Sequence, residues 1–408
     1  MRSNTLGTRS RTLRWSAVVV SMIVASMSVM TNPLPAQTLT WLGGNFAGNL
    51  WYAYPLMGIS DNGATVTARY RDSSFERGYI WRVGQQGMRE LAPFSGYSGS
   101  SVLKAISADG DKVYYYEFTE CGDLGSRVLR WEPTGPQGET ITVFSEAGTL
   151  LPHGCTPDGR YLCGHLYCVG PAGMFDVDTG TSWPLNTPQG YWGLALSITQ
   201  TGVNSWVVVG QLYDFNLNYT YPAIWRVSAP NSPGTVERIT ALNNSGRLLS
   251  VSADGTKACG YTFDTNFIDA ILWQEGGGSI VTLPDFGYRA GAFHMTADGN
   301  TIVGLATDSG GNPYAVRWTA SGNTYTIEDL NSTYADLLWP GSVLYTASAI
   351  SRDGRFIAGI GYNAWTRRVE AYLLDTRPCD LPDVTGDGFV DDSDLLEVLF
   401  AFGSSCGN

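Results

Sequence analysis

The sequence predicts an all-β protein, a seven-bladed β-propeller, and three observations lead to this prediction. The 408-residue chain is poor in charged residues (15%), rich in aromatic residues (12%) and contains 49 glycines, a composition typical of compact proteins built of strands and turns. One short phrase recurs seven times along the chain, and a second phrase carrying a tryptophan follows most copies. Six or eight blades are the alternatives, because the third and fourth repeats are irregular.

The first repeated phrase predicts the hairpin that opens each blade. It reads "AISADGDKV" at Ala105 and "AISRDGRFIAG" at Ala349, whereas "LSITQTGVNSWVVVG" at Leu196 is a degenerate copy. Asp-Gly favours a tight turn because glycine accepts a positive φ, and the Asp side chain is expected to bond the local backbone. The turn glycines, 43 to 55 residues apart, are Gly63, Gly110, Gly159, Gly202, Gly255, Gly299 and Gly354.

Two further phrases predict the third and fourth strands of each blade. The third strand carries a large aromatic residue, as in "AIWRV", and the fourth carries spaced Leu or Ile, as in "YTIEDL". Four strands within a period near 48 residues are the signature of a propeller blade. We expect the aromatic side chains to pack between neighbouring blades. They are Trp81, Trp131, Phe175, Trp225, Trp273, Trp318 and Tyr372.

The two ends of the repeat array predict how the ring closes. The seventh repeat stops after its third strand, at "YLLDTRP", while a lone strand, "TLTWLGG" at Thr38, precedes the first repeat. Placing this strand in the seventh blade would complete that blade and remove exposed sheet edges. We therefore expect a propeller over residues 37–377, closed by its N-terminal strand.

The repeats resemble a known group of extracellular proteins. Over roughly residues 38–375, "AIS-x-DG-xx-V-x-G" followed by "A-x-RW" is similar to the HAF-type repeats of bacterial propellers. This resemblance implies a fold and an extracellular setting, but no defined chemistry. The first phrase is also similar to the Asp box of sialidases. Here the glycine directly follows the Asp in most copies and the downstream aromatic residue is out of step, so no sialidase activity is carried over.

Residues 1–36 predict a secretory signal peptide. Arg2, Arg9, Arg11 and Arg14 form a basic segment, an apolar run follows, and "LPAQ" offers cleavage after Ala36. A retained anchor helix is the alternative. We expect bacterial-type export to an extracellular or cell-surface location, and no later segment is long and apolar enough to span a bilayer.

The net charge of −12 becomes more negative once these four arginines are removed. Such a surface excludes nucleic acid and anionic lipid as partners, and it suits cationic partners, metal ions or neutral polymers.

Seven cysteines in an exported chain predict disulfides and at least one unpaired thiol. Cys379 and Cys406 bracket the acidic C-terminal stretch and are expected to pair with each other. A zinc site is a competing interpretation for Cys155, Cys163, Cys168 and His165, although their spacing fits no common zinc finger.

Residues 378–408 predict a calcium-binding module. In "DVTGDGFVDDSDLLEVL", oxygen side chains alternate from Asp383 and Gly388 stands at the sixth position, which is the ligand spacing of an EF-hand loop. A solvated acidic linker, the alternative, would predict neither the spacing nor the glycine. The expected Ca²⁺ ligands are Asp383, Thr385, Asp387, the carbonyl of Phe389, Asp391 and Asp394.

This tail resembles a dockerin-type repeat, in which Asp at the twelfth position, here Asp394, is also usual. It departs from the pattern at Thr385, where Asn or Asp is usual, and it holds one loop where a full dockerin holds two. Single dockerin-like tails flanked by cysteines resemble C-terminal anchoring modules of secreted bacterial proteins. The resemblance implies attachment to a protein or cell-surface partner.

The sequence holds no recognisable catalytic motif: GxSxG, HExxH and a phosphate-binding loop are absent. His153, His165 and His294 stand outside any nucleophile or metal motif, and His294 is expected to face the propeller axis. Carboxylates from different blades could still converge as a glycoside-hydrolase pair. The candidates in hairpins between second and third strands are Asp214, Asp264, Asp269 and Asp308.

These observations predict a secreted, non-enzymatic propeller that offers a binding or scaffold surface, with a glycan as a candidate ligand and a calcium-loaded docking tail. A carbohydrate-active enzyme, either a glycoside hydrolase or a lyase, is the alternative. A structural component of a surface layer is the third interpretation. Carboxylates converging in a deep axial pocket would favour the enzyme, whereas a plugged or aromatic-lined axis would favour binding.

Overall fold

The computed structural model describes the propeller repeats but not the two ends of the chain. The signal segment 1–36, the tail 378–408 with its predicted calcium ligands, and Cys121, Cys168 and Asp264 lie outside the described residues. The structure describes residues 37–46, 57–71, 76–91, 99–118, 127–135, 138–146, 150–166, 170–240, 245–263, 268–276, 280–322 and 324–377.

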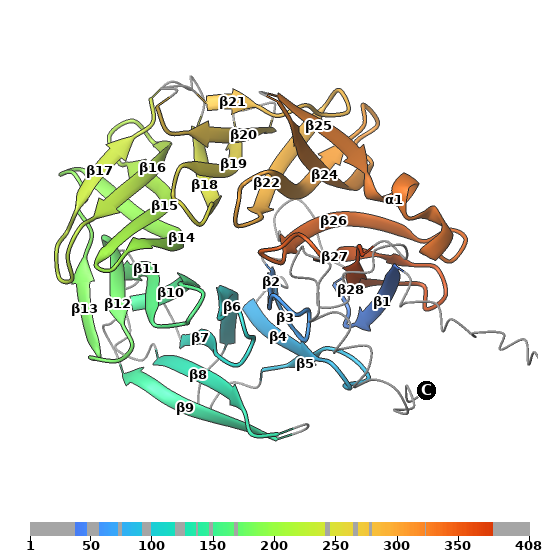
Figure 1. The fold of residues 1–408 in the computed structure, drawn as a ribbon, viewed down its shortest axis with the longest axis horizontal. Coiled ribbons are helices and arrows are strands. Elements are labelled where there is room, and N and C mark those ends of the chain that lie inside the picture. Colours follow the sequence, from blue (N-terminus) through green and yellow to red (C-terminus); the bar gives the residue numbers. More distant parts are fainter. Residues whose placement is uncertain are drawn as a thin grey trace, which may run out of the picture. The chain divides into compact units, whose positions relative to one another are not determined.

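The described strands form seven blades of four antiparallel strands arranged in a ring, which confirms the predicted count (Figure 1). One parallel pairing, Lys104 opposite Gly154, also joins the innermost strands of blades 2 and 3. Blade 1 consists of β2 (Met57–Ile59), β3 (Thr65–Arg71), β4 (Glu76–Arg82) and β5 (Arg89–Glu90). Blade 2 consists of β6 (Gly99–Ile106), β7 (Val113–Phe118), β8 (Arg127–Pro133) and β9 (Glu139–Glu146). Blade 3 consists of β10 (Leu150–Cys155), β11 (Tyr161–Leu166), β12 (Ala172–Asp176) and β13 (Thr181–Pro184).

Blades 4 to 6 follow the same order from the axis outward. Blade 4 consists of β14 (Tyr191–Gly202), β15 (Ser205–Asp214), β16 (Tyr219–Val227) and β17 (Thr235–Arg238). Blade 5 consists of β18 (Ser245–Val251), β19 (Lys257–Phe263), β20 (Ile268–Gln274) and β21 (Ile280–Thr282). Blade 6 consists of β22 (Arg289–Met295), β23 (Thr301–Thr307), β24 (Pro313–Ser321) and β25 (Thr324–Asp329). A helical turn, α1 (Leu330–Thr333), and the 3-10 turn η1 (Ala335–Leu337) lead into blade 7. Within the described part of the chain, no helix is long and apolar enough to cross a membrane.

Blade 7 joins the two ends of the repeat array, as predicted. It consists of β26 (Val343–Ile350), β27 (Phe356–Asn363) and β28 (Arg368–Asp375), with β1 (Thr38–Gly43) as its outermost strand. β1 runs antiparallel to β28, with Thr38 opposite Asp375 and Trp41 opposite Tyr372. Figure 1 shows this blue strand beside the red C-terminal strand.

The hydrophobic core is divided among the interfaces between blades, where the third-strand aromatic residues pack as predicted. Trp225 and Trp318 are both fully buried. Each indole Nε1 donates a hydrogen bond to a carbonyl of the preceding blade, that of Trp225 to Asn186 (2.7 Å) and that of Trp318 to Pro284 (2.7 Å). The indoles therefore both fill the interface and fix its register.

The Asp-Gly turns form as predicted, and glycine is required there for two reasons. In blade 2, the Ser107 Oγ donates to Asp109 and accepts from the Lys112 N–H (2.9 Å). Gly110 has a φ of 76°, and a Cβ placed on it would lie 2.7 Å from the Cβ of Ser60 in the preceding blade. The degenerate copy in blade 4 differs: its strands stay paired as far as Gly202 and Ser205, and Gly202 does not adopt a positive φ.

Candidate functional site

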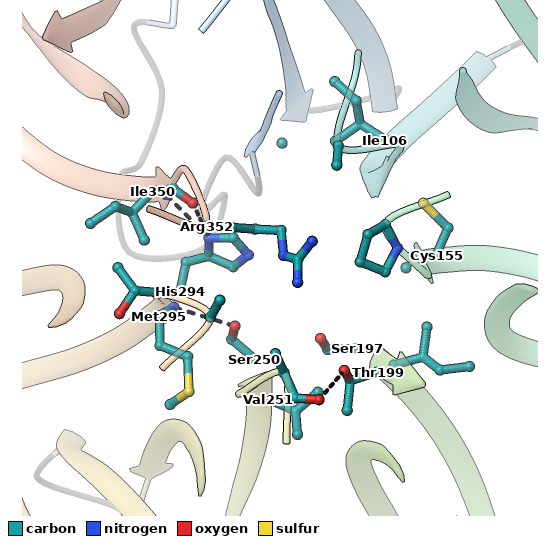
Figure 2. A pocket seen from close by; sticks show the side chains of 18 of the residues that line it. Ile106, Cys155, Ser197, Thr199, Ser250, Val251, His294, Met295, Ile350 and Arg352 are labelled. Atoms are coloured by element: carbon teal, nitrogen blue, oxygen red, sulfur yellow. Dashed lines mark hydrogen bonds between the residues drawn. The ribbon is translucent and has the colours of Figure 1, made fainter. Parts of the chain in front are cut away.

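The seven innermost strands surround a cavity of about 110 Å³ on the propeller axis (Figure 2). All seven blades contribute lining residues, and His294 is among them, as predicted. Its Nδ1 lies 3.1 Å from the backbone nitrogen and 2.9 Å from the carbonyl oxygen of Ile350 in the next blade. Figure 2 shows the His294 ring and the Arg352 guanidinium projecting into this axial cavity.

Hydrogen bonds link neighbouring blades around the axis, at the end of the cavity that carries the Asp-Gly turns. In four blades, the N–H of the residue just after the Ser or Thr of the repeated phrase donates to the carbonyl of the equivalent residue in the next blade. The links run from Asp61 to Ala108 (2.7 Å), from Ala108 to Pro157 (2.7 Å), from Ala253 to Ala297 (2.7 Å) and from Ala297 to Arg352 (2.9 Å).

Side chains supply two further links, but among the described residues no equivalent link runs from blade 3 to blade 4, because Pro157 has no N–H to donate. The Thr199 Oγ1 donates to the carbonyl of Ala253 (3.0 Å), and the Asp61 Oδ1 accepts from the N–H of Arg352 (3.0 Å), which joins blade 7 to blade 1. Desolvation raises the pKa of Asp61, although the Arg352 N–H and charge act to lower it. Among the residues that line the axial cavity, Asp61 is the one carboxylate, and it serves ring closure.

The predicted carboxylates stabilise their own hairpins instead of meeting at the axis. The Asp214 Oδ1 accepts from the N–H groups of Asn216 (2.9 Å) and Leu217 (3.2 Å). Asp308 accepts from Asn312 through both its backbone and its side chain, and these bonds lower the pKa of Asp308. Asp269 accepts from Thr262 (3.3 Å). None of these three lines the axial cavity.

The zinc interpretation does not fit the hairpin of β10 and β11. Cys155 lies opposite Leu162, and Cys163 lies opposite Gly154, so the two thiols point to opposite faces of the sheet. Both are free thiols, and burial raises the pKa of each. Among the described residues, no three His, Cys, Asp or Glu side chains gather as metal ligands. Cys155 and Cys163 therefore cannot hold one ion together.

Two histidines on β10 and β11 form a buried pair that the sequence did not reveal. The His153 Nε2 lies 2.8 Å from the His165 Nδ1, and the two imidazole rings stack on each other. Tyr116 contacts His153 edge-to-face, and Trp192 contacts His165 in the same way. The His153 Nδ1 is buried with no hydrogen-bond partner. Desolvation lowers the pKa of His153 well below its usual value, with contributions from His165 and Arg69, and it lowers the pKa of His165 to about 4. Both imidazoles are therefore neutral at pH 7.

This pair predicts a loss of stability in mild acid. The unfolded chain takes up protons near pH 6.5, whereas the folded pair resists them, so stability is full above pH 6.5 and falls as the pH drops. We expect a loss of about 2 kcal/mol per imidazole between pH 6.5 and pH 5. Urea unfolding of the wild type and of His165→Asn at both pH values measures it. An equal pH dependence in the two proteins would contradict the assignment.

Comparison with known proteins supports the fold alone. No family model and no curated protein matches the chain. Among solved structures, an oligogalacturonate lyase from Vibrio parahaemolyticus matches with a TM-score of 0.52 and 10% identity, over 83% of this chain and 93% of that one. The propeller domain of the Trilobed protease from Pyrococcus furiosus, described as having an open velcro topology, matches with a TM-score of 0.50 and 12% identity, over 84% of this chain and 96% of that one. A xyloglucanase from Xanthomonas campestris matches with a TM-score of 0.50 and 10% identity, over 82% of this chain and 55% of that one.

Proposed function

We propose that the protein is an exported, non-enzymatic binding propeller that a calcium-loaded C-terminal module attaches to a cell surface or an assembly. The observation that supports a binding role is that the described carboxylates near the axis and in the hairpins accept hydrogen bonds from the protein's own N–H groups. Asp61 closes the ring, and Asp214 and Asp308 each cap a turn. General acid–base chemistry needs carboxylates that are positioned around a substrate, and these are already engaged.

Attachment through the tail rests on the ligand spacing of Asp383 to Asp394 and on the two flanking cysteines. Calcium would neutralise a segment that is rich in acids and allow the apolar "LLEVLF" stretch that follows the loop to meet a partner. The carbohydrate-active alternative is supported only by the names of two structural neighbours. Release of reducing ends or of unsaturated sugars from a polysaccharide would establish that alternative.

The calcium site gives the sharpest test of this proposal. Asp387→Ala should abolish high-affinity Ca²⁺ binding because it removes the fifth-position ligand of a single loop. Isothermal titration of the full chain measures the affinity, and a sedimentation assay with cell-envelope fragments measures calcium-dependent retention.

Asp336→Ala, at an exposed carboxylate in η1, is the matched control and should leave both measurements unchanged. Unaltered Ca²⁺ affinity in Asp387→Ala would refute the loop assignment. Retention that survives both in this variant and in a calcium chelator would place attachment on the propeller instead.

A further inference from the structure

Two exposed tryptophans meet at one end of blade 7. Trp365 stands at the tip of the turn between β27 and β28 and is 71% exposed, and Trp339 precedes β26 and is 53% exposed. Their ring centroids lie 5.0 Å apart at an interplanar angle of 75°, an edge-to-face contact. Because the strands alternate in direction, both segments lie at the end of the blade opposite the Ser351–Gly354 turn.

Buried polar side chains hold the turn that displays Trp365. The Asn363 Oδ1 accepts from the N–H of Trp365 (3.0 Å), and its Nδ2 donates to Glu370 (2.8 Å). Glu370 also accepts from the Thr366 hydroxyl (2.7 Å). Asn363 and Glu370 are only 4% and 5% exposed, so a buried carboxylate orders a surface turn. Such a supporting layer pre-organises whatever the turn presents.

Ser342 ties the second tryptophan segment to the first. Its Oγ accepts from the N–H of Ala364 (3.0 Å), and its own N–H donates to the carbonyl of Trp339 (2.8 Å). Ser342 is buried as well. The relative position of the two indoles is therefore set by hydrogen bonds beneath them in addition to their mutual contact.

The equivalent turn of blade 4 shows that this fold does not need a tryptophan there. Asp214 takes the place of Asn363 and accepts from the same two following N–H groups. Asn218 has a φ of 52°, matching the 57° of Arg367. The position of Trp365 is occupied by Asn216. Trp365 therefore adds exposed apolar surface that the turn does not use.

We propose that the pair formed by Trp339 and Trp365, here called the tryptophan platform, binds the C–H face of neutral β-1,4-linked pyranose units in a polysaccharide. This inference rests on the proposed binding function and assigns it a ligand class. An edge-to-face contact consumes one indole face and leaves a flat, exposed π-face, whose negative quadrupole attracts the partially positive C–H groups of a pyranose ring. Equatorially substituted pyranoses carry such C–H groups on both faces.

Size and charge favour a sugar over other occupants. Two tryptophans bury at most about 500 Å², less than the ~800 Å² per partner of a stable protein interface. Pro340 and Leu338 beside Trp339 add only a little apolar surface, and the other exposed neighbours, Gly341, Thr366 and Arg367, add no large apolar side chain. A nucleic acid strand would be repelled by a chain with a net charge of −12.

Titration of the full chain with four neutral hexasaccharides tests the platform. The probes are the β-1,4-linked oligomers of glucose, xylose, mannose and N-acetylglucosamine, with isothermal calorimetry as the readout. We expect at least one to bind, and Trp365→Ala to weaken that binding at least tenfold. Trp365→Phe, which keeps a smaller π-face, should lose less. Phe215→Ala, an exposed aromatic residue in the equivalent turn of blade 4, should match the wild type.

Four results would overturn the inference: no binding of any hexasaccharide, binding that is unchanged in Trp365→Ala, binding of tetramethylammonium that depends on Trp365, or a dimer that dissociates in this variant. The third would indicate a cation site and the fourth a protein interface. Each leaves the proposed calcium-dependent attachment standing, because that attachment is measured with Asp387→Ala. Cleavage of a bound hexasaccharide would instead refute the non-enzymatic function itself.

Discussion

Replacing Trp225 with alanine is expected to lower the free energy of unfolding by about 3–5 kcal/mol. The indole is fully buried in a cluster that joins blades 3 and 4, where Trp183 and Trp206 also pack. Its loss leaves a large cavity and deprives the Asn186 carbonyl of its donor. Because the interfaces between blades hold the ring together, we expect the whole propeller to unfold at lower urea.

Trp365→Ala is the matched control for this experiment. It deletes the same side chain from a position that is 71% exposed, so the free energy of unfolding should change by no more than about 0.5 kcal/mol. Urea unfolding followed by circular dichroism measures both variants. Similar losses in the two would mean that the third-strand tryptophans do not carry the interfaces.

Leu42→Asp is expected to destabilise the protein by at least about 4 kcal/mol. Leu42 lies in β1, is fully buried, and packs with Met57 of blade 1 and Phe356 of blade 7 in one cluster. A carboxylate there would be desolvated and would displace β1 from β28. The prediction thus concerns closure of the ring as well as a single core contact.

Thr40→Asp on the same strand provides the comparison, because Thr40 is exposed and its carboxylate would remain in water. Hydrogen exchange along β28 and blade 1, together with urea unfolding, distinguishes the outcomes. If Leu42→Asp released only β1 while the seven blades kept their stability, closure by the N-terminal strand would be dispensable for the fold.

Features encoded by local repetition could be predicted from the sequence. The Asp-Gly turns, the third-strand tryptophans and the lone strand at Thr38 each recur or complete a pattern, and local rules for turns and apolar burial apply to them directly. The degenerate copy in blade 4 marked a real difference, since its hairpin forms without the positive φ at Gly202. The predictions for the calcium tail stay predictions, because Asp383–Asp394 lie outside the described residues.

Features that depend on distant parts of the chain could not be predicted. The hydrogen bonds between neighbouring blades use the variable position of the phrase, and only the register of seven strands brings Asp61 to Arg352. His153 and His165 meet because β10 and β11 pair with a bulge between Pro152 and Gly154. Hairpin positions were predicted for the carboxylates, but whether they converge depends on how the blades are arranged around the axis.

Ring closure in blade 7 also has a consequence for the order of folding. The side chain of Gln37 reaches the carbonyl of Thr376, a residue 339 positions away, so the contacts of β1 with β28 are among the most non-local in the chain. Contacts between successive blades, from blade 1 through blade 6, can form as the chain lengthens. The pairing of β1 with β28 must await the last strand. Until then the apolar side of blade 1, including Met57 and Val66, has no seventh blade to cover it. We therefore expect a slow final folding phase, during which an open six-blade intermediate is the species most prone to aggregate.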